Sequence, residues 1–218
     1  ISVFPLVRHL SKKTTAILIK TPLTPNQITF LSLISGLTAA SLFSVGDYEY
    51  NVIAVILLII SYVFDNCDGE IARAKGNTSE FGRKFDDVSD WWVHAAVFIG
   101  IGHGAETQSG NAIWWWFGLA ASIGATINYF IVQFLERKES DIHQASKKHA
   151  ADEFSEAPKN LIPLIIFIFR ELFRADFCFL LLLLAVFNIL WLILPAAAIG
   201  SQIYWMIAFY KGSRNFHV

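Results

Sequence analysis

The chain has 218 residues, of which 55% are hydrophobic, 15% are aromatic and only 16% are charged. Its mean hydropathy of +0.49 is typical of an integral membrane protein, and its formal net charge of −1 argues against a nucleic-acid-binding protein. The two cysteines, Cys67 and Cys178, are too few for a disulfide framework, and neither has the spacing of a zinc ligand. We therefore predict an all-α, polytopic membrane protein with a single domain over residues 1–218.

The N-terminal segment, residues 1–23, loosely alternates apolar and basic positions. It lacks the continuous apolar core of a cleavable signal peptide. We expect a short amphipathic helix that lies along the inner membrane face, although an ordinary amphipathic leader explains the pattern equally well. The sequence starts at Ile1 rather than at a methionine, so an additional domain upstream of it stays possible in our expectation.

Apolar runs predict the first four membrane-spanning helices, because each needs about 20 residues to cross the hydrocarbon layer. The first covers about residues 26–45, and the fourth about residues 113–135. The second is free of charge only over residues 50–64, and the apolar part of the third starts at Trp91. These two helices reach membrane length only if both extend into the charged segment 65–90.

The last third of the chain decides the number of spans. Residues 177–210 carry no charge, a length too great for one span and too small for two. Two spans fit if the fifth starts near Leu161, whereas one span fits if residues 161–174 form an interfacial helix. With six spans all 17 Lys and Arg lie on the cytoplasmic side or at its membrane edge, but with five spans Lys211 and Arg214 fall outside. We therefore predict six spans with both termini in the cytoplasm.

Four aspartates lie at helical spacing where the second span ends and the third begins. Asp65 and Asp68 are three residues apart, and Asp86 and Asp90 are four apart, so each pair shares a helical face. The short loop between the spans lets these faces converge, where uncompensated carboxylates would repel one another. Because such oxygen ligands suit magnesium, manganese or calcium, we predict a site for two divalent cations. The alternative is a solvated charged loop whose acids pair with Arg73, Lys75, Arg83 and Lys84.

The spacing of these residues, D-x2-D-G-x2-A-R-x8-G-x3-D-x3-D from Asp65 to Asp90, resembles the signature of the CDP-alcohol phosphotransferases at every fixed position. The resemblance is strong from about Thr24 to Asp90 and covers the rest of the chain only in layout. It implies that the phosphoryl-alcohol part of a CDP-alcohol moves to a second alcohol and that CMP is released. It also implies two Mg²⁺ or Mn²⁺ ions among the four aspartates, Asp65, Asp68, Asp86 and Asp90, with Asp90 also acting as the general base.

The same resemblance implies a set of contacts to the nucleotide and its phosphates. These are Thr24, Pro25, Asn26, Gln27, Gly69, Arg73, Ser79 and Gly82. A purely structural interpretation of the first of them stays open, because Thr24, Pro25 and Gln27 have the pattern of an N-terminal capping box. Gly69 and Gly82 lack side chains, so a ligand can approach the backbone beside the aspartates.

Two arginines and a histidine inside predicted spans also need an interpretation. Arg170 and Arg174 are four residues apart on one face of the fifth span, where arginines are usually functional or paired. They predict either a pocket for a phosphate of the acceptor or donor, or ion pairs with Glu171, Asp176 or the aspartates of the metal site. His94, one turn beyond Asp90, is expected to be a satisfied polar residue of the bundle rather than a metal ligand.

The identity of the two substrates stays open. The segment from Lys20 to Thr29 resembles synthases that use CDP-inositol or a similar soluble donor with inositol phosphate, some of them fused to an upstream cytidylyltransferase. Relatives that use CDP-diacylglycerol and make phosphatidylinositol phosphate often carry a Ser-Tyr-x-x-Ala-Arg segment in the fourth span. This chain has Asn-Tyr-Phe-Ile-Val-Gln there, starting at Asn128.

The expected setting is the inner (plasma) membrane of a prokaryote, with the active site facing the cytoplasm. The expected partners are a CDP-alcohol, an acceptor alcohol and the lipid bilayer; nucleic acid is not among them, and a homodimer is compatible with the resemblance. A divalent-cation transporter or channel is the alternative function. Such a protein needs polar groups through the whole depth of the membrane, whereas these acids gather at one edge.

Overall fold

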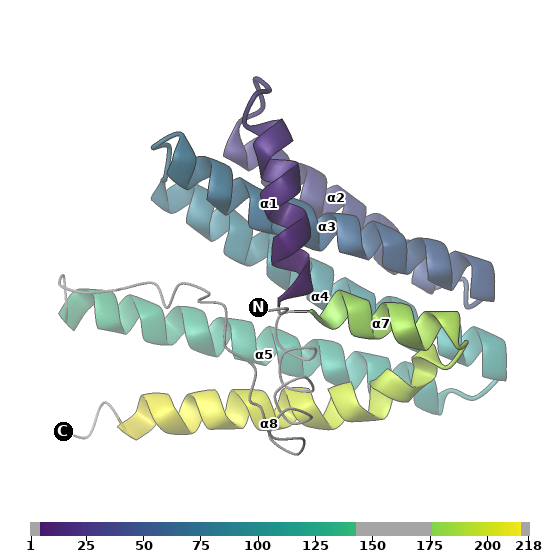
Figure 1. Cartoon of the computed structure of the whole chain (residues 1–218). Helices are drawn as coiled ribbons and strands as arrows, with labels where there is room; N and C mark the ends of the chain where they lie inside the picture. Colours follow the sequence, from purple (N-terminus) through teal and green to yellow (C-terminus); the bar gives the residue numbers. More distant parts are fainter. Residues whose placement is uncertain (1–4, 143–175, 215–218) are drawn as a thin grey trace, which may run out of the picture.

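The protein is all-helical in the part that the computed structural model describes, residues 5–142 and 176–214, as predicted. Figure 1 shows three long helices side by side, α2, α3 and α4, with α1 crossing α3 and with α5 and α8 paired below them. Along the chain the elements are α1 (Leu6–Leu18), α2 (Pro25–Phe43), α3 (Tyr48–Ala74), α4 (Glu80–Ser109), α5 (Ile113–Ile142), α7 (Phe177–Val186), the 3₁₀ helix η1 (Leu190–Leu192) and α8 (Ile193–Arg214).

Four of the described helical segments are long and apolar enough to cross a membrane: α2, α3, residues 113–135 of α5, and residues 190–210. They correspond to the first, second, fourth and sixth predicted spans. The third predicted span forms one continuous helix, α4, which is more polar than these four. The fifth, which was expected to start near Leu161, falls outside the described residues, so the six-span topology stays a prediction.

The second and third predicted spans do extend into the charged segment. α3 continues unbroken to Ala74, and α4 begins at Glu80 after a loop of five residues, 75–79. The Ser79 side chain accepts a hydrogen bond from Gly82 N at 3.0 Å and so caps the first turn of α4. Most of the charged residues therefore lie on the ends of two helices that both pack on α2, and not in an extended loop.

The start of α2 has the predicted capping box. Thr24 Oγ1 accepts from Gln27 N at 3.4 Å, and Gln27 Oε1 accepts from Thr24 N at 2.9 Å. Pro25 takes the first helical position, where a missing N–H costs nothing. This part of the structural interpretation is confirmed, and it fixes where α2 begins.

The N-terminal helix α1 lies against α3 and is attached to it by polar contacts. Ser11 Oγ donates to Glu70 Oε1 at 2.9 Å. Just beyond the ends of the two helices, Lys75 Nζ donates to the Leu23 carbonyl at 3.1 Å. At the other end of α1, the carboxylate of Asp176 accepts hydrogen bonds from Leu6 N at 2.7 Å and Val7 N at 2.9 Å. The predicted amphipathic helix is therefore present, and its position on a membrane surface stays a prediction.

The uncharged run 177–210 is divided by a turn. α7 ends at Val186, and Asn188 has a left-handed conformation with φ 56° before η1 and α8 follow. Asparagine adopts this conformation more readily than most residues, so the turn needs no glycine. The described part of the run thus forms a short helix that packs on α3 and a long one that packs on α5.

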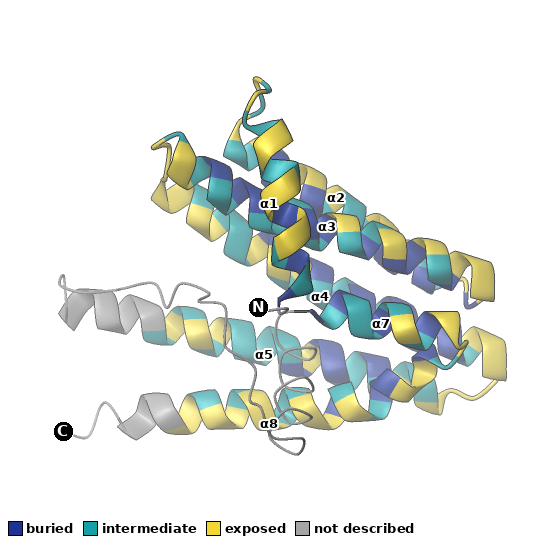
Figure 2. Cartoon of the chain, viewed as in Figure 1, coloured by how far each residue is buried: buried dark blue, intermediate teal, exposed yellow. Residues whose placement is uncertain are grey.

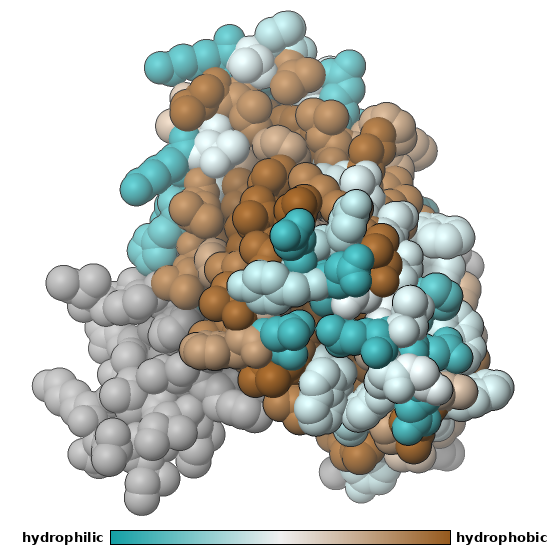
Figure 3. Space-filling model, turned by 90° about the vertical axis from the view of Figure 1, so that its right-hand side faces the viewer, coloured by the Kyte–Doolittle hydropathy of each residue, from teal (hydrophilic) through white to brown (hydrophobic). Residues whose placement is uncertain are grey.

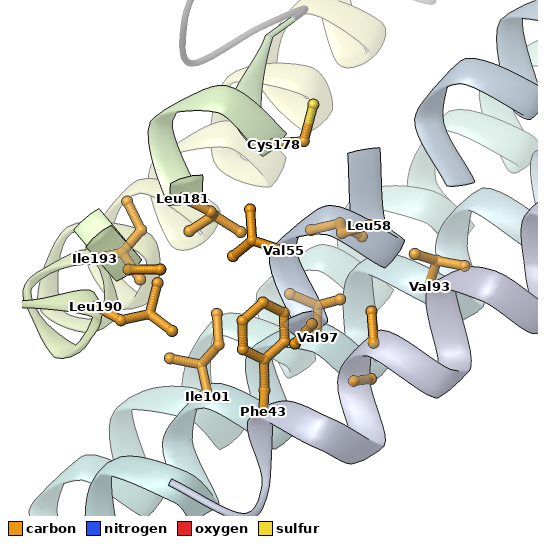
Figure 4. Packing of buried hydrophobic residues seen from close by; sticks show 14 of the residues in the cluster. Phe43, Val55, Leu58, Val93, Val97, Ile101, Cys178, Leu181, Leu190 and Ile193 are labelled. Atoms are coloured by element: carbon orange, nitrogen blue, oxygen red, sulfur yellow. The ribbon is translucent and has the colours of Figure 1, made fainter. Parts of the chain in front are cut away.

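The buried apolar residues join α2, α3, α4 and α7 into one core, and the exposed residues lie on the outer faces of the helices (Figure 2). Phe43, Val55 and Leu181 come from three of these helices and point toward one another (Figure 4). α2 and α4 can approach closely because α4 has glycines where they meet. A Cβ on Gly100 would collide with the Ala40 carbonyl, and one on Gly104 would collide with the Phe43 carbonyl.

Hydrophilic side chains gather over the end of the bundle where short loops join α2 to α3 and α4 to α5, with apolar side chains around them (Figure 3). The motif aspartates lie toward the other end of the bundle, near the C-terminal end of α3 and the N-terminal end of α4. Two polar ends separated by apolar helix faces are the arrangement expected of a protein that spans a bilayer.

Candidate active site

The four predicted aspartates come together where the end of α3 meets the start of α4. The charge of Asp65 interacts with the charges of Asp90, Asp86 and Asp68, and the charge of Asp86 also interacts with those of Asp68 and Asp90. Asp68 is only 5% exposed. Within the described residues, no group of three or more His, Cys, Asp or Glu side chains is arranged to hold a metal ion directly. The carboxylates are therefore neighbours, but they are not in coordination geometry.

Two observations bear on whether this donor set fits divalent cations. Asp86 Oδ1 is buried and has no hydrogen-bond partner in the structure described, and such an atom is costly unless a cation or another donor meets it. Four carboxylates provide the hard oxygen ligands that Mg²⁺ and Mn²⁺ prefer. In ligand type, the residues present fit the metals that the sequence pattern implies.

The bases beside the aspartates have partners of their own. Arg83 Nη1 lies 3.0 Å from Asp87 Oδ2, and Lys84 Nζ lies 2.6 Å from Glu80 Oε1. Lys75 Nζ donates to the backbone carbonyls of Thr21 and Leu23. Arg73, the fourth base of the segment, interacts with the charge of Asp68. The alternative, in which acids of this segment neutralise nearby bases, therefore stays open.

The hydroxyl of Thr29, one turn into α2, donates a hydrogen bond to Asp68 Oδ2 on α3. Thr29 is 3% exposed, so this bond is shielded from water. Sequence reasoning did not single out Thr29. The sequence did contain a signal for it. The start of α2 was expected near the aspartates, and Thr29 lies one turn after that start.

The residues expected to contact the nucleotide lie on the same end of the bundle as the aspartates. A Cβ on Gly82 would be 3.1 Å from Asn26 Oδ1 and 3.1 Å from Ser79 Oγ, so the starts of α2 and α4 are adjacent. A Cβ on Gly69 would be 3.2 Å from Arg73 Nη1. The side chains of Thr24, Gln27 and Ser79 cap their helices, and a role of the set Thr24, Pro25, Asn26, Gln27, Gly69, Arg73, Ser79 and Gly82 in binding a nucleotide stays a prediction.

A cavity of about 620 Å³ lies beside Asp65 and Asp90, within the range of small-molecule sites. Its walls come from α1, α3, α4, α5, α7 and α8, and they include the small residues Ala196 and Ala197. Asn128 Oδ1 is buried there without a hydrogen-bond partner among the described residues. The other polar residues of the wall are Arg8, Ser61, Tyr62, Asn66, His94, Ser201 and Tyr204.

His94 is satisfied inside the bundle, as expected. Its Nδ1 lies 2.8 Å from the Asp90 carbonyl oxygen, which can only accept, so Nδ1 carries the hydrogen. Its Nε2 lies 2.9 Å from the Tyr62 hydroxyl, which therefore donates to it. Both nitrogens are occupied, and His94 provides no free lone pair for a metal ion.

The two predicted phosphate-binding arginines, Arg170 and Arg174, lie outside the described residues. One of the acids proposed to pair with them, Asp176, is fully buried and binds the start of α1 through its carboxylate. Both interpretations of these arginines, a phosphate pocket and ion pairs, therefore stay predictions.

With this geometry in place, comparison with known proteins identifies the family. The sequence profile described as CDP-alcohol phosphatidyltransferase matches residues 22–199, which include every described element from α2 to η1. The chain belongs to this family. The resemblance seen in the motif is confirmed, and a family of membrane enzymes together with several apolar helices identifies an integral membrane protein.

Similar curated proteins carry names from this family. A "Bifunctional IPC transferase and DIPP synthase" of Rubrobacter xylanophilus is 34% identical over 91 residues, which is 42% of this chain and 20% of that protein. An "Archaetidylinositol phosphate synthase" of Pyrococcus horikoshii is 33% identical over 82 residues, 38% of this chain and 42% of that protein. A "Phosphatidylinositol phosphate synthase" of Mycobacteroides abscessus is 28% identical over 149 residues, 66% of this chain and 61% of that protein. The chain thus matches less than two thirds of the length of each of these relatives.

Proposed function

We propose that this CDP-alcohol phosphatidyltransferase transfers the phosphoryl-alcohol part of a CDP-alcohol to an acceptor alcohol and releases CMP. The observation that carries the proposal is the meeting of Asp65, Asp68, Asp86 and Asp90 at one end of the bundle, in the spacing of the family motif. The family profile extends over most of the chain and supports the same reaction class.

Asp65, Asp68, Asp86 and Asp90 would hold two divalent cations, Mg²⁺ or Mn²⁺. Cations bound there would neutralise negative charge on the pyrophosphate of the donor and on the leaving CMP. The buried, unpartnered Asp86 Oδ1 supports this assignment. The nucleotide would lie along the starts of α2 and α4, where Gly82 leaves space beside Asn26 and Arg73 can bind a phosphate oxygen.

Asp90 would act as the general base. It lines the cavity of about 620 Å³, so an alcohol placed there can present its hydroxyl to the carboxylate. The proton passes from that hydroxyl to Asp90 as the alcohol oxygen attacks the phosphorus, and the bond between this phosphorus and the CMP oxygen breaks. Such assistance is typically worth about 10²–10⁴-fold in rate.

The same cavity would hold the acceptor, and inositol phosphate is the acceptor that we favour. Two of the relatives are named as synthases of inositol phosphate lipids. The donor would be CDP-diacylglycerol, CDP-inositol or a similar CDP-alcohol. Arg170 and Arg174 would bind the phosphate of the acceptor, and their fit depends on residues outside the described part of the chain.

The protein would work in the plasma membrane of a prokaryote with this end of the bundle facing the cytoplasm, as a monomer or homodimer. The distribution of the 17 Lys and Arg supports this orientation. Nothing in the described helices favours the alternative of a cation transporter, because the motif carboxylates gather at one end of α3 and α4.

The test is release of CMP from purified protein in detergent, with and without Mg²⁺. A panel of CDP-diacylglycerol and CDP-inositol against inositol phosphate, glycerol phosphate and diacylglycerol would identify both substrates. We expect Mg²⁺-dependent release with at least one pair, and its loss in Asp65→Asn. Absence of release with every pair, combined with Mn²⁺ flux in proteoliposomes, would favour the transporter instead.

A further inference from the structure

The hydrogen bond from Thr29 to Asp68 has a role beyond packing. Thr29 Oγ1 on α2 donates to Asp68 Oδ2 on α3, and both side chains are buried. We propose that Thr29 is a positioning residue that holds the Asp68 carboxylate in the orientation needed to bind a divalent cation. This inference rests on the proposed function, since it assigns Asp68 to the metal site.

The direction of the bond follows from the chemistry of the two groups. A threonine hydroxyl has one hydrogen, and an ionised carboxylate has only acceptors. Thr29 Oγ1 also lies 3.2 Å from the Pro25 carbonyl of its own helix. The charged carboxylate is the stronger acceptor, so the hydrogen points toward Asp68. The bond therefore uses one lone pair of Asp68 Oδ2. The backbone N–H of Gly69 also donates to this carboxylate, and its remaining lone pairs can meet a ligand.

Thr29 is the first of a row of hydroxyl groups that connects α2 to α3. Ser32 Oγ donates to the Ser61 carbonyl, and Ser61 Oγ donates to the Ser32 carbonyl, both at 2.8 Å. Ser35 Oγ donates to the Leu57 carbonyl at 2.8 Å. These bonds recur every three residues along α2 and fix its register against α3. In this row Thr29 differs from Ser32 and Ser35 because its partner is a carboxylate and not a backbone carbonyl.

A bond of this kind is needed where Asp68 lies. Its carboxylate interacts with the negative charge of Asp90, and Asp86 interacts with Asp68 in turn. Like charges push a free carboxylate toward rotamers that increase their separation. A hydrogen bond from a rigid, β-branched side chain on a neighbouring helix opposes that rotation. Residues that orient metal ligands in this way typically account for about 10–100-fold in metal affinity or activity.

The competing explanation is that the hydroxyl merely satisfies a buried group. Both explanations predict some loss of stability when it is removed, so stability cannot separate them. Metal affinity can, because a packing role leaves the orientation of Asp68 to its own helix. Ser35→Ala is the matched control, since it removes a hydroxyl from the same row whose partner is the Leu57 carbonyl.

The experiment measures Mn²⁺ binding by electron paramagnetic resonance on the full chain in nanodiscs, without substrates. The variants are Thr29→Val, Thr29→Ser and Ser35→Ala, with Thr29→Ala in place of the valine if that protein does not fold. We expect the Mn²⁺ dissociation constant to rise about 10–100-fold in Thr29→Val and to stay within about threefold of wild type in Thr29→Ser and Ser35→Ala. The Mg²⁺ concentration for half-maximal CMP release should shift in parallel.

Two outcomes would overturn the inference, and they are distinguishable. If the wild type binds Mn²⁺ and Thr29→Val binds it equally well, Thr29 does not position Asp68, and the proposed function stands. If the wild type binds no Mn²⁺, the proposed metal site is wrong, and this inference is wrong with it.

Discussion

The attachment of α1 through Asp176 leads to a quantitative prediction. The first N–H groups of an α-helix have no partner within the helix. In α1 two of them, on Leu6 and Val7, donate to the Asp176 carboxylate at 2.7 and 2.9 Å, and Asp176 is fully buried. Asp176→Ala would leave both groups without this acceptor. We therefore expect α1 to separate from the bundle more often in this variant.

The size of the effect can be worked out from these two bonds. A hydrogen bond to a charged group contributes about 1.5–3 kcal/mol, so the pair contributes about 3–6 kcal/mol to the attachment of α1. Since about 1.4 kcal/mol corresponds to a factor of ten, local opening of α1 should become about 10²–10⁴ times more frequent. Asp176→Asn keeps one acceptor oxygen, so α1 should open more often in this variant than in the wild type and less often than in Asp176→Ala.

Hydrogen–deuterium exchange read by mass spectrometry in nanodiscs measures this opening directly. Amides of α1 should exchange faster in Asp176→Ala, while those of α2 and α5 keep their protection. Unchanged protection of α1 would refute the anchoring role. An equal loss of protection in all three helices would refute the local character of the attachment and show that Asp176 stabilises the whole fold.

Three further changes test the site and the packing. Asp90→Asn should lower turnover by about 10²–10⁴-fold while donor affinity is kept, and near-normal CMP release would remove the assignment of Asp90 as the base. Asn128→Leu should raise the Michaelis constant for the acceptor and leave that for the CDP-alcohol unchanged; equal changes in both would place Asn128 outside the acceptor site. Gly104→Ala should destabilise the protein by about 1–3 kcal/mol in thermal unfolding, because its methyl group would meet the Phe43 carbonyl. Gly200→Ala is the control, since its Cβ would have no atom within 4 Å, and an equal loss in both variants would contradict this explanation.

Much of the helical framework could be predicted from local pattern. The capping box at Thr24 and Gln27 marks the start of α2 through contacts three residues apart. The extension of α3 and α4 into the charged segment followed from the length that a membrane requires. Once both helices extend, the positions of Asp65 and Asp90 on neighbouring helix ends follow from their spacing along the chain.

Contacts between distant segments could not be predicted in this way. Asp176 is 170 residues from Leu6, and no local pattern connects the two. The turn at Asn188 interrupts a run without charge, where hydropathy alone offers no boundary. The cavity was also missed, because its walls come from several helices and join residues far apart in the sequence, such as Ser61, Asn128 and Ala196.

The cavity beside Asp65 and Asp90 also has a consequence for unproductive turnover. A space of about 620 Å³ that includes the carboxylates of Asp65 and Asp90 has room and polar partners for water when no alcohol fills it. Water carries the same reactive O–H group, and a base that accepts the proton of an alcohol can accept one from water. The donor would then be hydrolysed and wasted. If the acceptor filled the cavity closely, it would exclude this water and so protect the donor from hydrolysis.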